Sequence, residues 1–336
     1  MKAVIPAAGE GTRLYPQTHT KPKAMVRVAG KPILGHLLDQ LLEAAVDGVV
    51  IVVGTHKGSQ IVDYATEAYG DQLSLSFPEQ AVARGLGHAV YQAREAVGDD
   101  SVFVVLGDML FVDGYGGFLD AHHSSGADAT IGVQQVEEPQ HYGVVELDDD
   151  GRIRRLVEKP PDPPSNYAIS GLYAVEEGPA LFETLENLIA ADDRGAGGEF
   201  QLTDAFQRMV DGGETLRAAE VSSWYDCGRP EPLLDVNRVL LDRREPGGVD
   251  VDTADAVVVP PVDIGRGVEI ESSVVGPYVS IDRETTVRDC VVRDSIVGRG
   301  AELAGLTLER SLVADEAAIT SDPLRLNVGA NDRLDL

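Results

Sequence analysis

Past residue 255 the chain repeats a short unit, in which two apolar residues stand four positions apart and the next unit begins five or six residues on. An apolar residue that faces inward once per short flat strand, with small turn residues between strands, is typical of a parallel β-helix. Several such units in a row favour this fold over an irregular strand-rich tail. With three units a coil, it would have about three to four coils. The units lie at 264–268, 270–274, 287–291 and 297–301.

The preceding part of the chain alternates strand and helix signals. Residues 49–54 are apolar, as expected for a strand inside a parallel sheet, and Pro32 stands in the tolerated first turn of an apolar-periodic helix. This βαβα rhythm predicts an α/β fold with a Rossmann-like, doubly wound mixed sheet and right-handed crossovers. Strands are expected at 2–6, 49–54, 73–77, 102–106, 129–135, 143–147, 153–158 and 169–175, and helices at 32–45, 58–69, 88–97, 179–190, 202–211 and 230–244.

Between the part with alternating strands and helices and the repeats, the composition changes to Gly, Pro and Asp, which indicates a linker. We therefore expect a first domain over 1–242, a linker over 243–256, and the β-helix with a tail over 257–336. A length of 336 residues fits two domains.

The charge of the chain limits its partners. It has 56 acidic against 28 basic residues, a formal net charge of −28. Such a surface repels nucleic acid and anionic membranes, so neither is an expected partner, and a nucleotide site must be a local basic island. The basic residues are mostly arginine. This balance suits a protein kept soluble in concentrated salt, which predicts a halophilic source; an acidic mesophilic protein is the alternative.

Three features of the sequence predict a cytoplasmic location. No apolar stretch approaches the roughly 20 residues needed to cross a bilayer. The N-terminal residues run directly into a short strand, without the apolar region and cleavage site of a secretory signal. The two cysteines, Cys227 and Cys290, make no disulfide framework.

A glycine-rich loop follows the first strand, where doubly wound sheets bind ligands. Gly9 and Gly11 let the backbone approach phosphate oxygens, and Arg13 and Lys23 supply cations. Neither the Walker A pattern nor the dinucleotide-binding pattern fits, because the required Gly-Lys-Ser/Thr and third glycine are missing. The loop therefore indicates a phosphate site of another kind.

Beside this loop, the chain contains further short motifs in a fixed order. The full set is 9–16 with 21–23, Gln80 with 85–89, 106–108, 142–145, 158–160 and 224–228. In sequence and order these motifs resemble those of the sugar-phosphate nucleotidylyltransferases, which include glucose-1-phosphate thymidylyltransferases and uridylyltransferases. The resemblance covers roughly residues 1–240. It implies that the C-terminal β-helix is the left-handed, hexapeptide-repeat kind.

The resemblance implies an enzyme that joins a sugar 1-phosphate, in the first place glucose 1-phosphate, to dTTP or UTP and releases pyrophosphate. Positioning and charge neutralisation would perform an in-line displacement, with Mg²⁺ as the cofactor. The implied site comprises Arg13 and Lys23 for catalysis; Ala8, Gly9, Gly11, Thr12, Gln80 and Gly85 for the nucleotide; Tyr142, Gly143, Glu158, Lys159 and Gly171 for the sugar phosphate; and Asp108 and Asp226 for the metal.

Taken alone, several of these residues have simpler interpretations. Asp108 could cap a turn and Asp226 a helix entry, and Glu158 with Lys159 could be a solvated ion pair. Gln80 carries an amide that complements a uracil or thymine edge, but alone it would be ordinary surface. His88 at a helix start is more often a structural cap than a base.

Some positions depart from the family pattern. Met109 stands where a polar Asn is expected beside the metal, and the stretch 195–199 is lengthened, so Arg194 is not assigned to the sugar phosphate. The form of 85–89 favours UTP and that of 106–108 favours dTTP, which leaves the nucleotide open.

Three other functions are alternatives, of which a dinucleotide-dependent oxidoreductase fails on the missing third glycine and the missing acidic residue at the second strand. Acetyl transfer by the β-helix generally needs a base there, usually His, and the last histidine of the chain is His141. The sequence also opposes a non-catalytic paralogue that binds sugar nucleotide, because it contains all five of the residues Arg13, Lys23, Asp108, Lys159 and Asp226. We expect the β-helix to serve in a homo-oligomer.

Overall fold

The computed structural model describes residues 1–244 and 255–322. They divide into two compact units, residues 1–236 in the first and residues 237–244 and 255–322 in the second. The predicted domain boundary at 242/243 lies at the end of α8 (Pro230–Asp242), and most of the predicted linker lies outside the described residues. None of the helices in the described part has the length and hydrophobicity that a membrane span requires.

The first unit contains a mixed sheet, which confirms the predicted fold class. Its central strand β1 pairs in parallel with β4 and β7, whereas β12 runs antiparallel to β7, β9 and β10. The strand order is β11-β10-β12-β7-β1-β4-β5, with β9, β13 and β6 joined off this path. The strands are β1 (Lys2–Pro6), β4 (Gly48–Gly54), β5 (Leu75–Ser76), β6 (Glu79–Gln80), β7 (Val102–Val105), β9 (Ala129–Gln135), β10 (Gly143–Leu147), β11 (Ile153–Glu158), β12 (Tyr167–Val175) and β13 (Leu216–Glu220).

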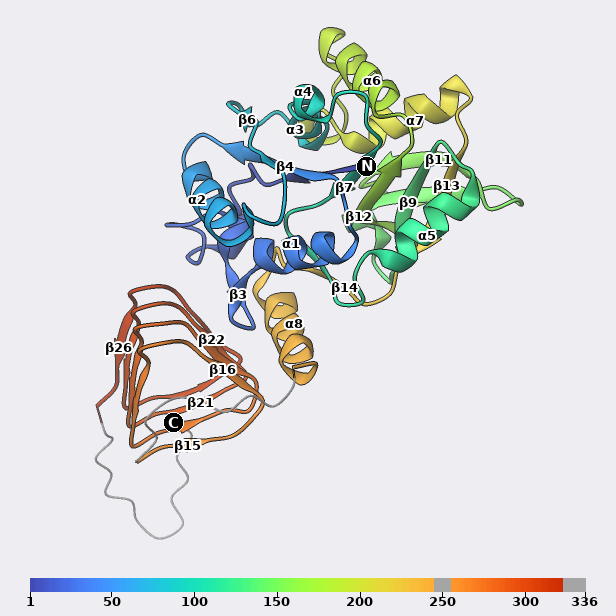
Figure 1. The fold of residues 1–336 in the computed structure, drawn as a ribbon. Coiled ribbons are helices and arrows are strands. Elements are labelled where there is room, and N and C mark those ends of the chain that lie inside the picture. The colour runs from blue at the N-terminus through green and yellow to red at the C-terminus, as the bar shows by residue number, and fades with distance from the viewer. Residues whose placement is uncertain (245–254, 323–336) are drawn as a thin grey trace. The chain divides into compact units, whose positions relative to one another are not determined.

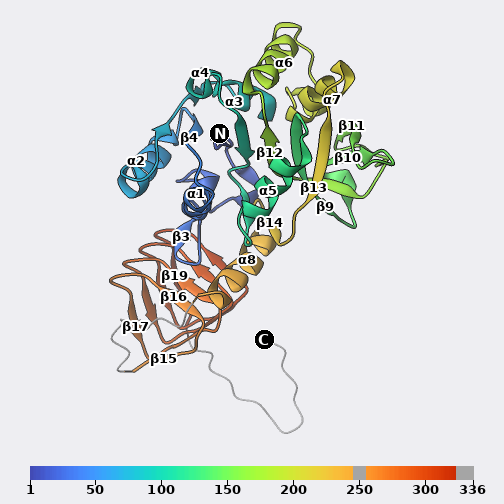
Figure 2. The same ribbon diagram turned by 45° about the vertical axis from the view of Figure 1, so that its right-hand side comes forward.

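Helices cover both faces of this sheet (Figure 1). Figure 2 shows the same arrangement from a second side, with α3, α6 and α7 together on one face and α1 and α5 on the other. In α1 the apolar stripe is buried, with Leu34, Leu37, Leu38 and Leu41 fully buried. The helices are α1 (Ile33–Glu43), α2 (Gly58–Tyr69), α3 (Leu86–Tyr91), α4 (Arg94–Val97), α5 (Gly116–Ser125), α6 (Gly178–Ala190) and α7 (Leu202–Gly212).

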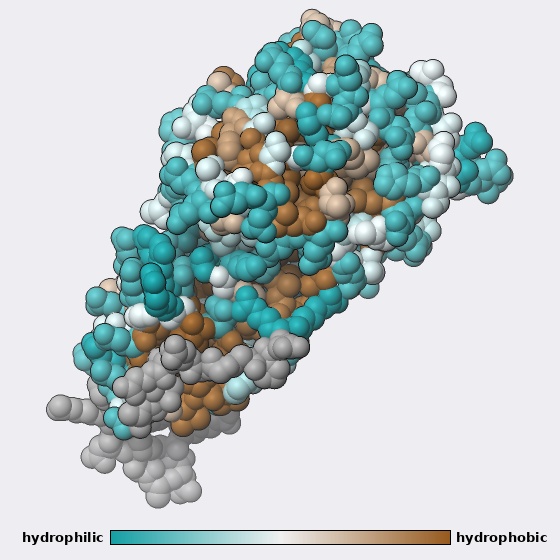
Figure 3. Space-filling model, viewed as in Figure 1, coloured by the Kyte–Doolittle hydropathy of each residue, from teal (hydrophilic) through white to brown (hydrophobic). Residues whose placement is uncertain are grey.

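Hydrophilic residues dominate the face of the first unit seen in Figure 3, and apolar residues show near its centre. This distribution agrees with the acidic composition, because most of the charge excess must be at the surface.

Two sequence predictions in this unit need correction. The helix expected over 88–97 is divided into α3 and α4, with Gln92 and Ala93 between them. The expected strand over 73–77 shortens to β5, with β6 following at Glu79–Gln80.

The second unit is a parallel β-helix, as predicted. Val274 pairs in parallel with Val257 of the preceding coil and with Val291 of the following coil. Each coil turns its apolar residues inward, so Val275, Val287 and Val292 are fully buried. The three sheets contain β15 (Val257–Val258), β18 (Val274–Val275), β21 (Val291–Arg293) and β24 (Thr307–Glu309); β16 (Val262–Ile264), β19 (Val279–Ile281), β22 (Ile296–Val297) and β25 (Leu312–Val313); and β17 (Glu269–Glu271), β20 (Thr286–Arg288), β23 (Glu302–Ala304) and β26 (Ala318–Thr320).

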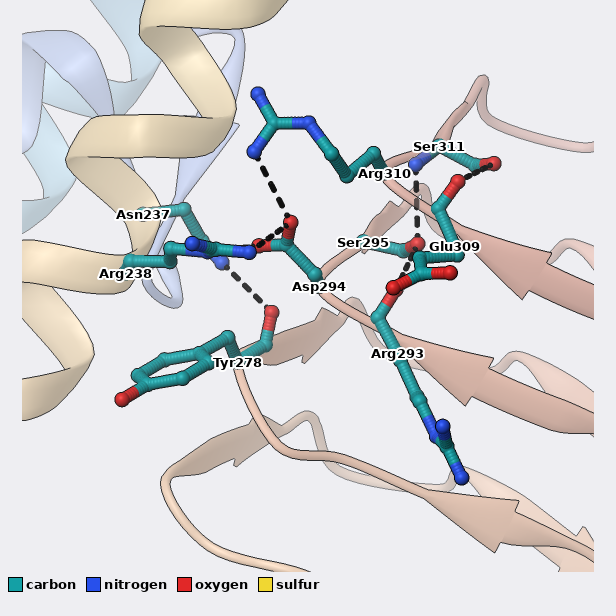
Figure 4. A network of polar contacts seen from close by, with 9 residues as sticks. All are labelled: Asn237, Arg238, Tyr278, Arg293, Asp294, Ser295, Glu309, Arg310 and Ser311. Carbon is teal, nitrogen blue, oxygen red and sulfur yellow. Dashed lines mark hydrogen bonds and ion pairs between the residues drawn. The ribbon is translucent and has the colours of Figure 1, made fainter.

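A polar network joins residues 237–238 of α8 to the β-helix coils (Figure 4). Arg238 makes two hydrogen bonds of 2.6 Å to the carboxylate of Asp294, and Arg310 donates to the same carboxylate at 3.3 Å. The Asp294 side chain is 5% exposed. Asn237 donates to the Tyr278 carbonyl oxygen at 3.2 Å and accepts from Ser280 at 2.7 Å. A nearly buried carboxylate is therefore satisfied by two arginines.

We expect Arg238→Met to destabilise the second unit by about 2 kcal/mol, because removal of one partner of a buried pair leaves an undercompensated charge. The estimate is below the range for fully buried pairs because the Arg238 side chain is 42% exposed. Urea unfolding followed by circular dichroism measures the change. Arg299→Met is the matched control, since its pair with Glu316 is exposed. Equal effects of the two substitutions would contradict the role given to the network.

Candidate active site

The glycine-rich loop connects β1 to a short 3₁₀ turn at Thr12–Leu14. Gly11 has a positive φ of 67°, and a Cβ atom there would lie 3.0 Å from the Lys23 Cβ and 3.1 Å from the Thr18 side chain. The Thr18 hydroxyl donates to the Gly11 carbonyl oxygen at 2.8 Å. A side chain at position 11 would therefore disturb both the loop and Lys23.

The loop borders a cavity of about 400 Å³, which we call the loop cavity. It brings together predicted residues from three separate segments of the sequence. These are Ala8, Gly9, Gly11, Thr12, Arg13 and Lys23 from the first segment, Gln80 and Gly85 from the second, and Asp108 from the third. The cavity is also lined by Leu86, Ala89 and Gly228, which belong to the predicted motifs without a role of their own, and by Glu199, which was not predicted.

Two carboxylates meet at the Lys23 ammonium. Asp108 follows β7, and Asp226 ends β14 (Trp224–Asp226). The Lys23 Nζ atom donates to Asp108 Oδ2 and lies 3.8 Å from Asp226 Oδ1. The side chain of Lys23 is 12% exposed, so its positive charge is held largely inside the protein between two negative charges.

A pair of short strands holds the two carboxylates together. β14 runs antiparallel to β8 (Met109–Phe111), with Asp226 opposite Met109. The Cys227 amide donates to the Asp108 carbonyl oxygen at 2.9 Å. Met109, where the family pattern led us to expect a polar residue, is buried. Its backbone pairs with Asp226 between β8 and β14, and its side chain packs inside the protein.

Four of the five predicted sugar-phosphate residues, Tyr142, Gly143, Glu158 and Lys159, lie in or directly beside the paired strands β10 and β11, whereas Gly171 lies in β12. Gly143 is directly opposite Glu158, and the Lys159 amide donates to the Tyr142 carbonyl oxygen at 3.0 Å. The Lys159 Nζ atom lies 3.3 Å from Glu158 Oε1, and its side chain is 59% exposed. Lys159 has a positive φ of 42°, which is uncommon for a residue with a side chain and marks a constrained backbone.

A hydroxyl that the sequence interpretation missed holds Glu158. Thr203 in α7 donates to Glu158 Oε2 at 2.7 Å and is 3% exposed. A Cβ atom on Gly143 would lie 3.0 Å from this carboxylate oxygen and 3.3 Å from the Thr203 hydroxyl. Gly143 thus leaves room for the pair. A single threonine at a helix start gives no sequence signal for this role.

Tyr142 belongs to a second cavity, of about 230 Å³, which Arg13 also lines. The Tyr142 ring packs edge-on against Trp224, with centroids 5.5 Å apart. Burial raises the pKa of Tyr142, and the nearby Asp226 carboxylate adds to this. Because Arg13 and Asp226 line this cavity and Arg13 also lines the loop cavity, the two spaces lie next to each other. Glu138, His141 and Arg229 are lining residues that were not predicted.

Gly171 supports the turn that carries Asp108. It has a positive φ of 94°, and a Cβ atom there would lie 2.9 Å from the Leu106 side chain. Its carbonyl oxygen accepts from the Leu106 amide at 3.1 Å. Its observed contacts are thus with the strand end before Asp108.

The chain belongs to the nucleotidyl transferase family, whose model matches residues 2–243. It is 34% identical to a glucose-1-phosphate thymidylyltransferase of Streptomyces griseus, over 96% of this chain and 94% of that protein. It is 33% identical over the full length of both chains to the low-salt glycan biosynthesis nucleotidyltransferase Agl11 of Haloferax volcanii. A solved UDP-glucose pyrophosphorylase, complexed with UDP-glucose, is 26% identical and superposes with a TM-score of 0.64 over 72% of this chain and 99% of that one.

Proposed function

We propose that this chain is a sugar-1-phosphate nucleotidylyltransferase that joins glucose 1-phosphate to UTP or dTTP. The observation that carries the proposal is the loop cavity, where a glycine-rich backbone, Arg13, Lys23 and Asp108 converge. The similarity to a glucose-1-phosphate thymidylyltransferase and to a glycan biosynthesis nucleotidyltransferase supports this reaction class. A catalytic domain over 1–242 followed by a β-helix domain from 257 is part of the proposal.

The reaction needs no strong base, because the nucleophile is already a phosphate anion. An oxygen of the sugar phosphate forms a bond to the α-phosphorus as the bond from that phosphorus to the pyrophosphate oxygen breaks. The chain's part is to align the two anions and to offset their charge. In this scheme the loop amides and Arg13 bind the β- and γ-phosphates, Lys23 faces the α-phosphate, and Lys159 binds the sugar phosphate.

The carboxylate pair fits a magnesium ion. Asp108, in the turn between β7 and β8, and Asp226, at the end of β14, already share one cation, the Lys23 ammonium. Mg²⁺ binds through one or two carboxylates together with phosphate oxygens, and these two side chains match that donor set. A bound Mg²⁺ would neutralise charge on the triphosphate at this position.

Thr203→Val should raise KM for glucose 1-phosphate about tenfold, because a hydrogen bond to a charged group is lost while side-chain shape is kept. Glu158 would then lose the partner that sets its orientation toward the sugar hydroxyls. KM for the nucleotide should not change. Thr203→Ser restores the hydroxyl and should restore KM. If Thr203→Val raises KM for glucose 1-phosphate and for the nucleotide by the same factor, the threonine serves only stability.

The acidic surface and the β-helix complete the proposal. A net charge of −28 supports adaptation to concentrated salt and excludes nucleic acid as an expected partner. We infer a homo-oligomer in which the β-helix supplies subunit contacts. Acetyl transfer is not proposed, because the whole sequence has no histidine after His141. The cytoplasmic location stays a prediction.

Pyrophosphate release from the purified protein tests the proposal. The assay contains Mg²⁺ and molar KCl and crosses dTTP, UTP, ATP, CTP and GTP with glucose 1-phosphate. N-acetylglucosamine 1-phosphate and mannose 1-phosphate run in parallel. Release with a uracil or thymine nucleotide supports the proposal and identifies the nucleotide. If folded protein that binds nucleotide releases no pyrophosphate with any of these substrate pairs, the chain is a non-catalytic paralogue.

A further inference from the structure

The orientation of the Gln80 amide is fixed by its neighbours. Gln80 is 7% exposed and lines the loop cavity. Its amide nitrogen lies 3.2 Å from the Gly85 carbonyl oxygen and 2.9 Å from His88 Nδ1. Because a backbone carbonyl oxygen can accept but not donate, the atom that faces Gly85 must be the NH₂ group. The position of the amide oxygen follows from this assignment.

His88 is the second acceptor for this NH₂ group. A neutral imidazole accepts at one nitrogen and donates at the other, so the 2.9 Å contact puts the ring proton on Nε2. The Gln92 amide nitrogen lies farther from the ring, at 3.4 Å from Nε2, and it already donates to the His88 carbonyl oxygen at 3.1 Å. The shorter contact therefore sets the tautomer.

Both hydrogens of the Gln80 NH₂ group are thus used within the protein. The Gln80 carbonyl oxygen accepts no hydrogen bond from the described residues. It is also not among the buried polar atoms that lack a partner, so it is accessible from outside. The oxygen can accept from a ring N–H, which uracil and thymine carry at N3. Cytosine N3 and adenine N1 carry a lone pair instead, so the same oxygen would repel them.

We propose that His88 is a positioning residue that locks the Gln80 amide with its oxygen available to the nucleotide, and that this lock makes the site reject cytosine. His88 is not among the residues that line the loop cavity, so it acts through Gln80. The inference rests on the proposed function, because it assumes that the nucleotide base reaches Gln80.

Substitution at His88 tests the lock. His88→Leu removes the acceptor, which lets the amide turn and offer N–H to the cavity. We expect the ratio of kcat/KM for the preferred pyrimidine nucleotide over that for CTP to fall about tenfold, the loss for one of the two bonds that hold the amide. His88→Asn keeps a polar atom near the Nδ1 position and should retain most of the ratio. Calorimetric binding of UTP, dTTP and CTP gives the same comparison without turnover.

The unmodified protein gives a second test through pH. Protonation places a hydrogen on Nδ1, so His88 becomes a donor that faces the NH₂ group and the amide is driven to turn. Burial holds the pKa of His88 below its ordinary 6.5, and the Arg84 cation adds to this. The other groups around the ring are the neutral Gln80 and Gln92 and the stacked ring of Phe200. The ratio should therefore be constant above pH 6.5 and fall at lower pH, whereas in His88→Asn it should not change.

The outcomes separate this inference from the proposed function. If the wild-type protein releases no pyrophosphate with any nucleotide, the proposed function fails, and calorimetric binding still tests the lock. If the protein is active but His88→Leu weakens UTP, dTTP and CTP by the same factor, His88 is merely structural and the inference is overturned. A wild-type ratio that stays constant down to the lowest pH at which the protein remains folded would also overturn it.

Discussion

Asp108→Asn is expected to lower kcat for pyrophosphate release by about 10²–10³-fold, the range found when one electrostatic contact to a transition state is removed. Asparagine keeps the shape of the side chain and removes its charge. It would take away one of the two carboxylates that meet at Lys23 and one of the two proposed Mg²⁺ ligands. Steady-state kinetics at saturating glucose 1-phosphate and nucleotide, over a range of Mg²⁺ concentrations, measures the loss.

Asp63→Asn is the matched control for this substitution. Asp63 is exposed on α2 and is not a lining residue of the loop cavity, and the substitution changes net charge by the same amount. It should leave kcat unchanged. If Asp108→Asn keeps the wild-type kcat and the wild-type Mg²⁺ response, the carboxylate is a turn cap and the metal assignment is wrong.

The sequence predicted the long, strongly patterned elements well. The strands expected at 129–135, 143–147 and 153–158 agree with β9, β10 and β11, because the apolar and β-branched residues of each strand lie within one short window of the sequence. α5 was missed. It begins with two glycines, and only Phe118, Leu119 and His122 are buried. With so few buried residues, the segment shows no apolar pattern that repeats at the helical period.

The short strands that form the site could not be predicted from sequence patterns. β8 and β14 have three residues each and are far apart in the chain, so neither shows a pattern of its own. The resemblance to known enzymes indicated Asp108 and Asp226 as separate ligands, but not that Lys23 lies between them. Thr203 and the His88–Gln80 contact were missed for the same reason, because each is a pairing of side chains that only the folded chain brings together.

Lys23→Met should separate two roles of this lysine. Its ammonium contacts both carboxylates of the proposed metal pair, so it competes with a divalent cation for the same negative charge. Removal of the ammonium should strengthen Mn²⁺ binding about tenfold, equivalent to about 1.4 kcal/mol of relieved cation repulsion. The same substitution should lower kcat by about 10²–10³-fold, because the α-phosphate loses its cation. Mn²⁺ binding without nucleotide, followed by electron paramagnetic resonance, gives the first value, and pyrophosphate release gives the second.

Lys23→Arg is the control that keeps the charge. A Cβ atom on Gly228 would already lie 2.6 Å from the Lys23 ammonium, so the larger guanidinium cannot take the same position. Arginine should therefore retain the repulsion of Mn²⁺ without restoring kcat. We expect Lys23→Met to bind Mn²⁺ more tightly and to lose kcat. We expect Lys23→Arg neither to bind Mn²⁺ more tightly nor to recover kcat. Weaker Mn²⁺ binding in Lys23→Met would mean that the lysine holds the carboxylates in place for the metal, and the competition would be excluded.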